Sequence, residues 1–105
     1  MSAVRKHDEW LSKKLQNANF AAEYLNAATE DDDPATYLAA LRKIAEARGG
    51  LSHIAQETGL SREALYRTLS SRGNPTVKTL TAILKVSGLK LSFSAKTNGG
   101  RRRTA

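Results

Sequence analysis

LSHIAQETGLSREALYRTL, residues 51–69, is the stretch from which the fold is best predicted. Gly59 stands between two short apolar-periodic runs, where a left-handed conformation that disfavours a Cβ would end the first helix. Ser52 and Ser61 each precede one run, and a serine hydroxyl there can accept a free backbone N–H. Two short helices joined by a tight glycine-containing turn form a helix-turn-helix, and we predict one here.

The apolar positions of this stretch fit the same motif. A small residue, Ala55, would let the two helices cross closely, and the polar positions of the second helix would face outward. An outward polar face favours DNA binding over the alternative, an ordinary helical hairpin whose glycine is only a C-cap. The side chains expected to face inward are Ile54, Ala55, Thr58, Leu60, Leu65 and Leu69.

Length and composition exclude several classes of protein. The 105 residues are enough for one small helical domain, and the absence of cysteine excludes disulfides and thiolate metal sites. No apolar run approaches the length that spans a membrane, and the N-terminal MSAVRKHDEW lacks the apolar core of a signal peptide. We therefore expect a soluble cytoplasmic protein.

The net charge of +7 is unevenly divided along the chain. Residues 1–50 carry seven Lys and Arg against eight Asp and Glu, whereas residues 51–105 carry ten against two. We therefore expect the second half to bind a polyanion. Neutralisation of phosphates by Lys and Arg supplies most of the non-specific affinity for nucleic acid. General solubility, the alternative, gives no reason for so uneven a division.

Local signals predict three helices before the motif. Residues 1–7 are expected to be a frayed lead-in to a helix over about 8–16, and a second helix is expected over 19–29. Asp33 followed by Pro34 is a strong start signal for the third helix, which would stop at Gly49-Gly50. The third helix is expected to pack behind the motif through Tyr37, Leu38, Leu41, Ile44 and Ala45.

After the motif, Thr76 is expected to cap a further helix, which Gly88 closes. Residues 89–93 alternate between apolar and polar side chains, as a half-buried strand does. That strand would have to pair with its equivalent in a second copy or with another protein, because its backbone groups need partners. The inward side chains expected from the helix are Val77, Leu80, Ile83 and Leu84.

Side chains suited to catalysis or metal binding are sparse. The two imidazoles, His7 and His53, are far apart in sequence, and no Ser–His–acid set, glycine-rich phosphate loop or pair of carboxylates can be assembled. The acids of residues 30–33 would bind a hard cation only with further oxygen ligands. We expect no enzyme activity, no cofactor and no metal.

The helix that starts at Ser61 is expected to enter the major groove of DNA with its first residues nearest the bases. Arg62 and Arg67 are the strongest candidates for reading sequence, because a guanidinium can bind both acceptors of guanine. Tyr66 would contact a thymine methyl or a phosphate, and Glu63 would accept from cytosine or orient an arginine. One such module buries too little surface for a stable specific complex, so a homodimer on an inverted repeat is expected. The candidate base-reading residues are Ser61, Arg62, Glu63, Tyr66, Arg67 and Ser70, and the candidate phosphate contacts are Ser52, Arg72, Asn74, Thr76 and Lys78.

Segments on both sides of the motif carry a family resemblance. They are FAAEYLNAATEDDDPATYLAALRKIAEARGG (20–50) and SRGNPTVKTLTAILKVSGLKLSF (71–93). With the motif between them, the chain resembles the HigA-type antitoxins, the addiction-module antidote proteins of bacterial type II toxin–antitoxin pairs. The resemblance implies a five-helix Cro/repressor-like domain, repression of the protein's own operon and neutralisation of a RelE/ParE-like toxin. Thr68 departs from the apolar residue that many repressor motifs place three after Leu65, which puts the rotation of the recognition helix in question.

A protein partner is also indicated by the first third of the chain. Its two helices carry more large apolar side chains than they can bury on a compact core. Residues 15–41 include five acids, Glu23 and those of 30–33, but no Lys or Arg, which would suit a basic toxin. An acidic solvated loop with an N-cap explains the acids almost equally well. The candidate toxin contacts are Trp10, Leu11, Leu15, Phe20, Tyr24 and Leu25.

We therefore expect an all-α protein with extra N-terminal helices and a short C-terminal strand. Residues 1–32 would bind the toxin or support a dimer, residues 33–94 would form a self-contained DNA-binding domain, and residues 95–105 would be a disordered basic tail. The alternative is a free-standing small helix-turn-helix transcriptional regulator without a toxin. A short basic reading frame beside the gene would favour the antitoxin.

Overall fold

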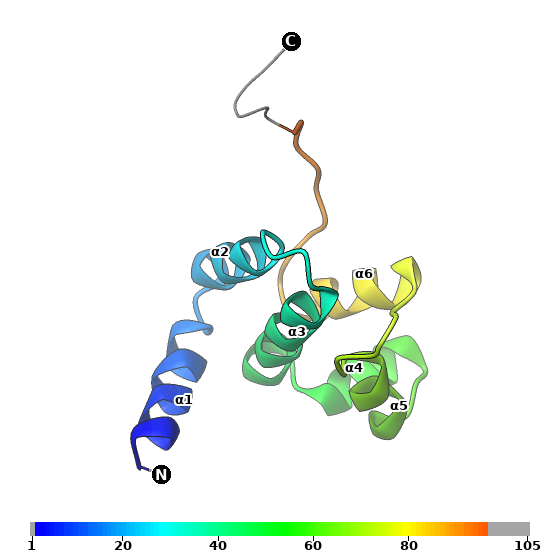
Figure 1. Ribbon diagram of the computed structural model, residues 1–105. Helices are drawn as coiled ribbons and strands as arrows, with labels where there is room; N and C mark the ends of the chain where they lie inside the picture. The colour runs from blue at the N-terminus through cyan, green and yellow to red at the C-terminus, as the bar shows by residue number, and fades with distance from the viewer. Residues whose placement is uncertain (1, 97–105) are drawn as a thin grey trace.

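The computed structural model describes residues 2–96, and these residues form six helices and no strand (Figure 1). In chain order the helices are α1 (Ser2–Lys14), α2 (Ala18–Ala28), α3 (Pro34–Arg48), α4 (Leu51–Thr58), α5 (Arg62–Thr68) and α6 (Val77–Val86). Figure 1 shows α3 in the middle, with α1 and α2 on one side and α4, α5 and α6 on the other. The prediction of an all-α fold is confirmed, but residues 33–94 hold four helices, α3 to α6, and not the five that the resemblance implied.

Side-chain caps account for four of the helix starts. Asp33, Ser61 and Thr76 each accept a hydrogen bond from a backbone N–H two or three residues on, at 3.0–3.1 Å. Pro34 takes the first position of α3, where its missing N–H costs nothing. Asn17 caps α2 in the same way, through the N–H of Phe20. The three caps predicted at residues 33, 61 and 76 are confirmed.

Two helix starts differ from the predictions. Ser52 does not cap α4, because Gly50 precedes the helix with a φ of 79° and α4 already begins at Leu51. Glycine adopts this positive φ without strain, so the chain enters the helix before Ser52 is reached. The predicted frayed lead-in is also wrong for residues 2–7, which belong to α1. That stretch contains no glycine or proline that would stop a helix.

The predicted strand over residues 89–93 does not form. The N–H of Leu89 bonds to the carbonyl of Leu84, and the side chain of Leu89 packs on the core. Beyond it the chain leaves the helices, with Leu91 44 % and Phe93 90 % exposed. A strand needs a second strand for its backbone groups, and the helices around this segment present none.

The core lies on two sides of α3. Ile44 packs with Leu11, Leu15 and Ala21, which come from α1 and α2. Leu25 packs against both sides of this core, so the apolar interior is continuous across the predicted domain boundary at residue 33. The larger cluster, shared with α4, α5 and α6, contains Leu38, Leu41, Ala45, Leu51, Ile54, Leu65, Leu69, Ile83 and Leu84.

Most of the predicted inward side chains are buried. Val77 is the clear exception at 71 % exposure, because it is the first residue of α6 and extends past the end of the core. Half-buried side chains at the edges of the larger cluster are Tyr37, Ala55, Thr58, Leu60 and Leu80.

Arg48, at the end of α3, joins three segments that are distant in sequence. Its Nε donates to the carbonyl of Ser87 at 2.5 Å. Its Nη1 donates to the carbonyls of Leu15 and Gln16, at 3.2 and 2.5 Å. These acceptors are the carbonyl of Ser87, the residue that follows α6, and two carbonyls of the α1–α2 connection. The planar guanidinium supplies donors in several directions, which a lysine ammonium cannot reproduce in the same geometry.

We predict that Arg48→Ala lowers the free energy of unfolding by about 2–3 kcal/mol, because three carbonyls, those of Ser87 and Leu15 in partly buried contacts, lose a charged donor. Arg48→Lys should recover less than half of that loss. Urea denaturation followed by circular dichroism measures both. Lys85→Ala, which removes a cation from an exposed position of α6, is the control and should change stability by under about 0.5 kcal/mol. An unchanged midpoint for Arg48→Ala would contradict this role.

The two serines of the motif provide a matched pair. Ser61→Ala should lower the free energy of unfolding by about 1 kcal/mol, because the N–H of Ala64 loses its acceptor. Ser52→Ala should have no such cost, since this exposed serine lies inside α4 and makes no capping bond. The same urea titration compares the two variants. Equal losses would show that capping does not distinguish them.

Candidate nucleic-acid interface and partner surface

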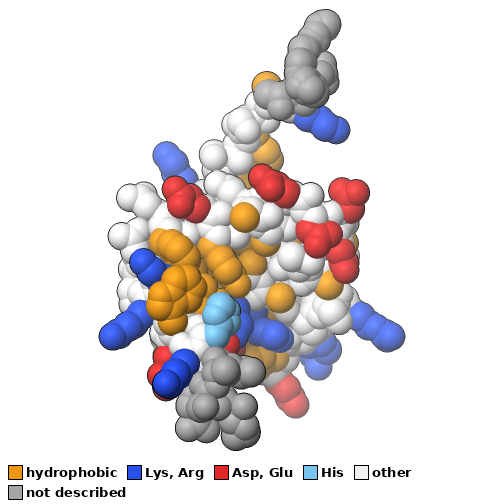
Figure 2. All heavy atoms as spheres, turned by 60° about the vertical axis from the view of Figure 1, so that its left-hand side comes forward, with side chains coloured by type: hydrophobic (Ala, Val, Ile, Leu, Met, Phe, Trp, Pro, Cys, Tyr) orange, Lys and Arg blue, Asp and Glu red, His pale blue; other side chains and the backbone are white. Residues whose placement is uncertain are grey.

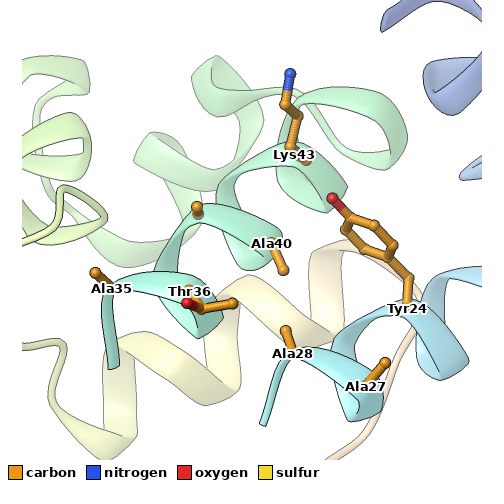
Figure 3. Close-up of a pocket in the computed structure, with 8 residues that line it drawn as sticks. Tyr24, Ala27, Ala28, Ala35, Thr36, Ala40 and Lys43 are labelled. Carbon is orange, nitrogen blue, oxygen red and sulfur yellow. The ribbon is translucent and has the colours of Figure 1, made fainter. Parts of the chain in front are cut away.

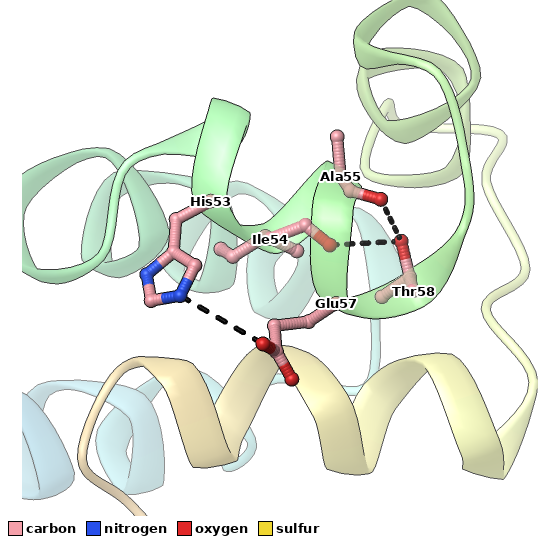
Figure 4. A network of polar contacts seen from close by, with 5 residues as sticks. All are labelled: His53, Ile54, Ala55, Glu57 and Thr58. Carbon is pink, nitrogen blue, oxygen red and sulfur yellow. Dashed lines mark hydrogen bonds and ion pairs between the residues drawn. The ribbon is translucent and has the colours of Figure 1, made fainter.

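α4 and α5 are held at a defined angle by the turn between them. Gly59 takes a φ of 77°, and its N–H bonds to the carbonyl of Ala55 at 2.9 Å. Thr58 reinforces the turn, since its hydroxyl donates to the carbonyl of Ile54 at 2.9 Å (Figure 4). The same hydroxyl accepts the N–H of Leu60 at 3.2 Å. The left-handed glycine predicted at this position is confirmed.

The rotation of α5 is determined by its buried side chains. Leu65 and Leu69 are both fully buried in the larger cluster, whereas Thr68 is only half-buried. The second apolar anchor is therefore Leu69, four residues after the first. This spacing keeps both leucines on one face of the helix.

The opposite face of α5 is polar and exposed. Glu63, Tyr66 and Arg67 are exposed away from the two leucines, and Arg62 is exposed in the first turn of the helix. Neither arginine lies within ion-pair distance of a carboxylate among the described residues. Two guanidiniums and a phenol thus remain available on a helix that is anchored from behind.

The other two candidate base readers are engaged by the backbone. Ser61 is exposed, but its hydroxyl oxygen accepts the capping bond of α5. Ser70 is half-buried, and its hydroxyl donates to the carbonyl of Arg67 at 2.7 Å. The two hydroxyls therefore stabilise the two ends of α5 through local hydrogen bonds.

The candidate phosphate contacts come from three segments. They lie in the first turn of α4, in the connection after α5 and at the start of α6, and all of them are exposed. Gly73 permits the tight path of that connection, because a Cβ there would lie 1.7 Å from the carbonyl oxygen of Thr68. The residues are Ser52, Arg72, Asn74, Thr76 and Lys78.

His53 and Glu57 occupy the outer face of α4. The imidazole Nε2 lies 3.8 Å from a carboxylate oxygen of Glu57 (Figure 4), and the two side chains are 59 % and 50 % exposed. Exposure of His53 agrees with its prediction as a surface residue. Within residues 2–96, no group of three or more histidines or acids is placed to hold a metal ion. None of the helices there is long and apolar enough to cross a membrane.

A row of aromatic side chains crosses α1 and α2 on the other side of the molecule. His7 stacks on Trp10 at 5.9 Å between ring centres, Trp10 meets the edge of Phe20 at 6.4 Å, and Phe20 stacks on Tyr24 at 6.5 Å. Lys14 Nζ lies 5.9 Å from the ring centres of both Trp10 and Phe20, within the range of a cation–π contact. Figure 2 shows an apolar patch on this face, with acidic side chains along a neighbouring edge.

The candidate toxin contacts divide into two groups. Leu11 and Leu15 are buried against Ile44, and Leu25 is packed against both clusters, so these three support the fold. The sequence pattern could not show this, because the part of α1 that faces α3 depends on tertiary packing. Trp10, at 51 % exposure, and the half-buried Phe20 and Tyr24 remain at the surface.

A groove of about 620 Å³ runs from Tyr24 between α2 and α3. Figure 3 shows Tyr24 extending from α2 toward Lys43 of α3, with small side chains along the floor. The ammonium of Lys43 is 3.6 Å from the carboxylate of Asp8, so its charge is partly compensated. The lining residues are Tyr24, Ala27, Ala28, Ala35, Thr36, Ala39, Ala40 and Lys43.

The acidic run at the end of this groove has partly local roles. Asp31 accepts the N–H of Asp33 at 2.9 Å and the hydroxyl of Thr36 at 3.0 Å, and these bonds hold the pKa of its carboxyl below the usual value. Asp33 caps α3. Glu30 and Asp32 are exposed, and neither has a side-chain hydrogen bond to the described residues.

Comparisons with known proteins agree with the resemblance in the sequence. Residues 5–95 match the family described as "probable addiction module antidote protein". An uncharacterized protein of Haemophilus influenzae is 43 % identical over 73 residues, which cover 70 % of this chain and 72 % of that protein. No solved structure matches the chain. The antidote resemblance is confirmed, whereas the HigA type remains a prediction. The chain belongs to the family of probable addiction module antidote proteins.

Proposed function

We propose that the protein is an antitoxin that binds DNA through α5 and a toxin through the surface of α1 and α2. Membership of an antidote family supports the first part, since an antidote implies a toxin of some kind. Repression of its own operon, a RelE/ParE-like toxin and a homodimeric state complete the proposal.

The polar face of α5 is the observation that carries DNA binding. A helix anchored by Leu65 and Leu69 and joined to α4 through a left-handed Gly59 has the build of a helix-turn-helix recognition helix. Its outward Arg62 and Arg67 are suited to bidentate contact with guanine. These features support a Cro/repressor-like mode of binding, in which α5 enters the major groove.

Flanking groups would position the helix on the DNA backbone. Ser52 and Lys78 lie in the first turns of α4 and α6, where free backbone N–H groups attract phosphate. The excess of Lys and Arg after residue 50 would supply sequence-independent attraction. Most of the predicted basic tail, residues 97–105, lies outside the described residues. On this proposal it adds to the same salt-dependent affinity.

We predict that Arg67→Ala weakens binding to the DNA upstream of the protein's own gene by roughly 1–3 kcal/mol, while affinity for random DNA changes little. The reason is that the substitution would remove a guanidinium contact with base edges and would leave the phosphate contacts in place. Gel-shift titrations on both DNAs measure the difference. Lys13→Ala, which removes a cation from exposed α1, is the control. Equal loss on both DNAs would show that Arg67 contacts phosphate only.

The aromatic row supports a protein partner. The exposed Trp10 and the half-buried Phe20 are already ordered by their edge-to-face contact, so a partner would cover apolar area at a low entropic cost. Glu30 and Asp32 at the neighbouring edge would attract a basic toxin. A transcriptional regulator without a toxin, the second candidate, would leave this apolar surface without a use.

We predict that Trp10→Ala reduces capture of the adjoining gene's product by roughly tenfold or more, as expected for a central aromatic contact. Co-expression followed by purification through a tag on the antitoxin, with the complex quantified by mass, tests this. Val77→Ala, at an even more exposed apolar position on α6, should capture as wild type does. Undiminished capture by Trp10→Ala would remove the aromatic row from the interface. A wild-type chain that captures nothing would favour the regulator.

A further inference from the structure

The segment after α6, residues 89–96, exposes apolar side chains that no other described residue buries. Leu89 reaches the core, and Leu91 and Phe93 follow at every second position, the latter the most exposed of the large apolar side chains described. The intervening Lys90 and Ser92 are exposed as well. Beyond the N–H of Leu89, no backbone hydrogen bond within the described residues satisfies this segment. Figure 1 shows it leaving the helices as a single trace.

A groove of about 610 Å³ lies beside this segment. It is bounded by α2 on one side and by the segment itself on the other, with Tyr37 and Leu84 at its floor. Burial raises the pKa of the Tyr37 hydroxyl, in keeping with an apolar site. The same chain therefore presents an exposed phenylalanine and an adjacent groove lined by both apolar and polar side chains.

We propose that a second copy of this chain covers the segment, by antiparallel pairing of the two segments about Ser92. An antiparallel pair of identical strands has a two-fold axis through its centre, so every contact is made twice and the interface closes at two copies. The pairing satisfies the free backbone groups of both segments. Both apolar faces lie on one side of the resulting ribbon, with the two helical bodies beneath it.

The side chains select the register. With Ser92 at the centre, Leu91 lies opposite Phe93 of the second copy and Lys90 lies opposite Ser94. An aliphatic–aromatic pair is favourable across strands, whereas like charges placed opposite each other are not. A register centred on Phe93 would set Lys90 against Lys96. One centred on Leu91 would pair Phe93 with Leu89, which is already packed in its own core.

Charge favours a second copy over a basic toxin as the occupant. The polar side of the segment carries Lys90 and Lys96 and no acid, so a partner that places cations opposite these lysines would be repelled. In the proposed register the two lysines of one copy face Ser94 and Gly88 of the other. The inference deepens the homodimer of the proposed function, because two α5 helices on one ribbon would read two half-sites of an inverted repeat.

Phe93→Asp tests the interface without touching the core, since the side chain is 90 % exposed. We expect the full-length wild type to sediment as a dimer and Phe93→Asp to raise the dimer dissociation constant at least about thirtyfold. Unchanged far-UV circular dichroism would show that the variant is folded. Val77→Asp, with the same charge added at another exposed apolar position, should remain dimeric. A wild type that is monomeric, or a Phe93→Asp variant that dimerises as wild type does, would overturn the proposal.

The absence of cysteine allows the register to be tested by cross-linking. In Ser92→Cys the two thiols face each other across the two-fold axis, at a separation that a disulfide can span. In Ser94→Cys they lie four residues apart along the ribbon, or about 13 Å. We expect rapid oxidation to a covalent dimer for the first variant and slow oxidation for the second. Equal rates would overturn pairing about Ser92.

These measurements separate the interface from the proposed function. A chain that dimerises through Phe93 but fails to shift its upstream DNA would contradict DNA binding and leave the interface intact. A Phe93→Asp variant that stays dimeric but no longer captures the adjoining gene's product would assign the segment to the toxin, and the proposal of a second copy would be wrong.

Discussion

Burial of α3 on two sides is the constraint on which the rest of the fold depends. Leu41 and Ala45 face the cluster shared with α4, α5 and α6, while the adjacent Ile44 faces α1 and α2. Helices as short as α4 and α5 are not stable alone, because the free-energy cost of nucleating a helix exceeds what the hydrogen bonds of two turns recover. They persist here because the central helix gives their leucines a surface to cover.

The central position of α3 also separates the two proposed binding surfaces. α5 lies on one side of α3, and α1 and α2, which carry the aromatic row, lie on the other (Figure 1). Charge follows the same division, with cations after residue 50 and the acidic run at 30–33. On the proposed function, DNA and toxin would therefore be attracted to different faces, and neither would have to displace the other.

Local chemistry made part of this structure predictable, whereas packing between distant segments did not. The helix starts at Asp33, Ser61 and Thr76 could be predicted because each cap is a hydrogen bond to a backbone N–H only two or three residues away. Gly59 was predictable for the same reason. Arg48 was missed, since its three acceptors lie more than thirty residues away and no short pattern marks them. Residues 89–93 do alternate between apolar and polar side chains, but a strand also requires a neighbouring strand to pair its backbone groups, and the described helices supply none.

The candidate sites show the same limit. The exposed side of α5 followed from two leucines four residues apart, whereas the burial of Leu11 and Leu15 required knowledge of what α1 packs against. That packing has a thermodynamic consequence. Because Leu25 and Leu89 contact both clusters, α1 and α2 share one core with α5. A partner that binds only the folded N-terminal helices would stabilise the whole core by mass action, and α5 would be held more firmly without any change of shape.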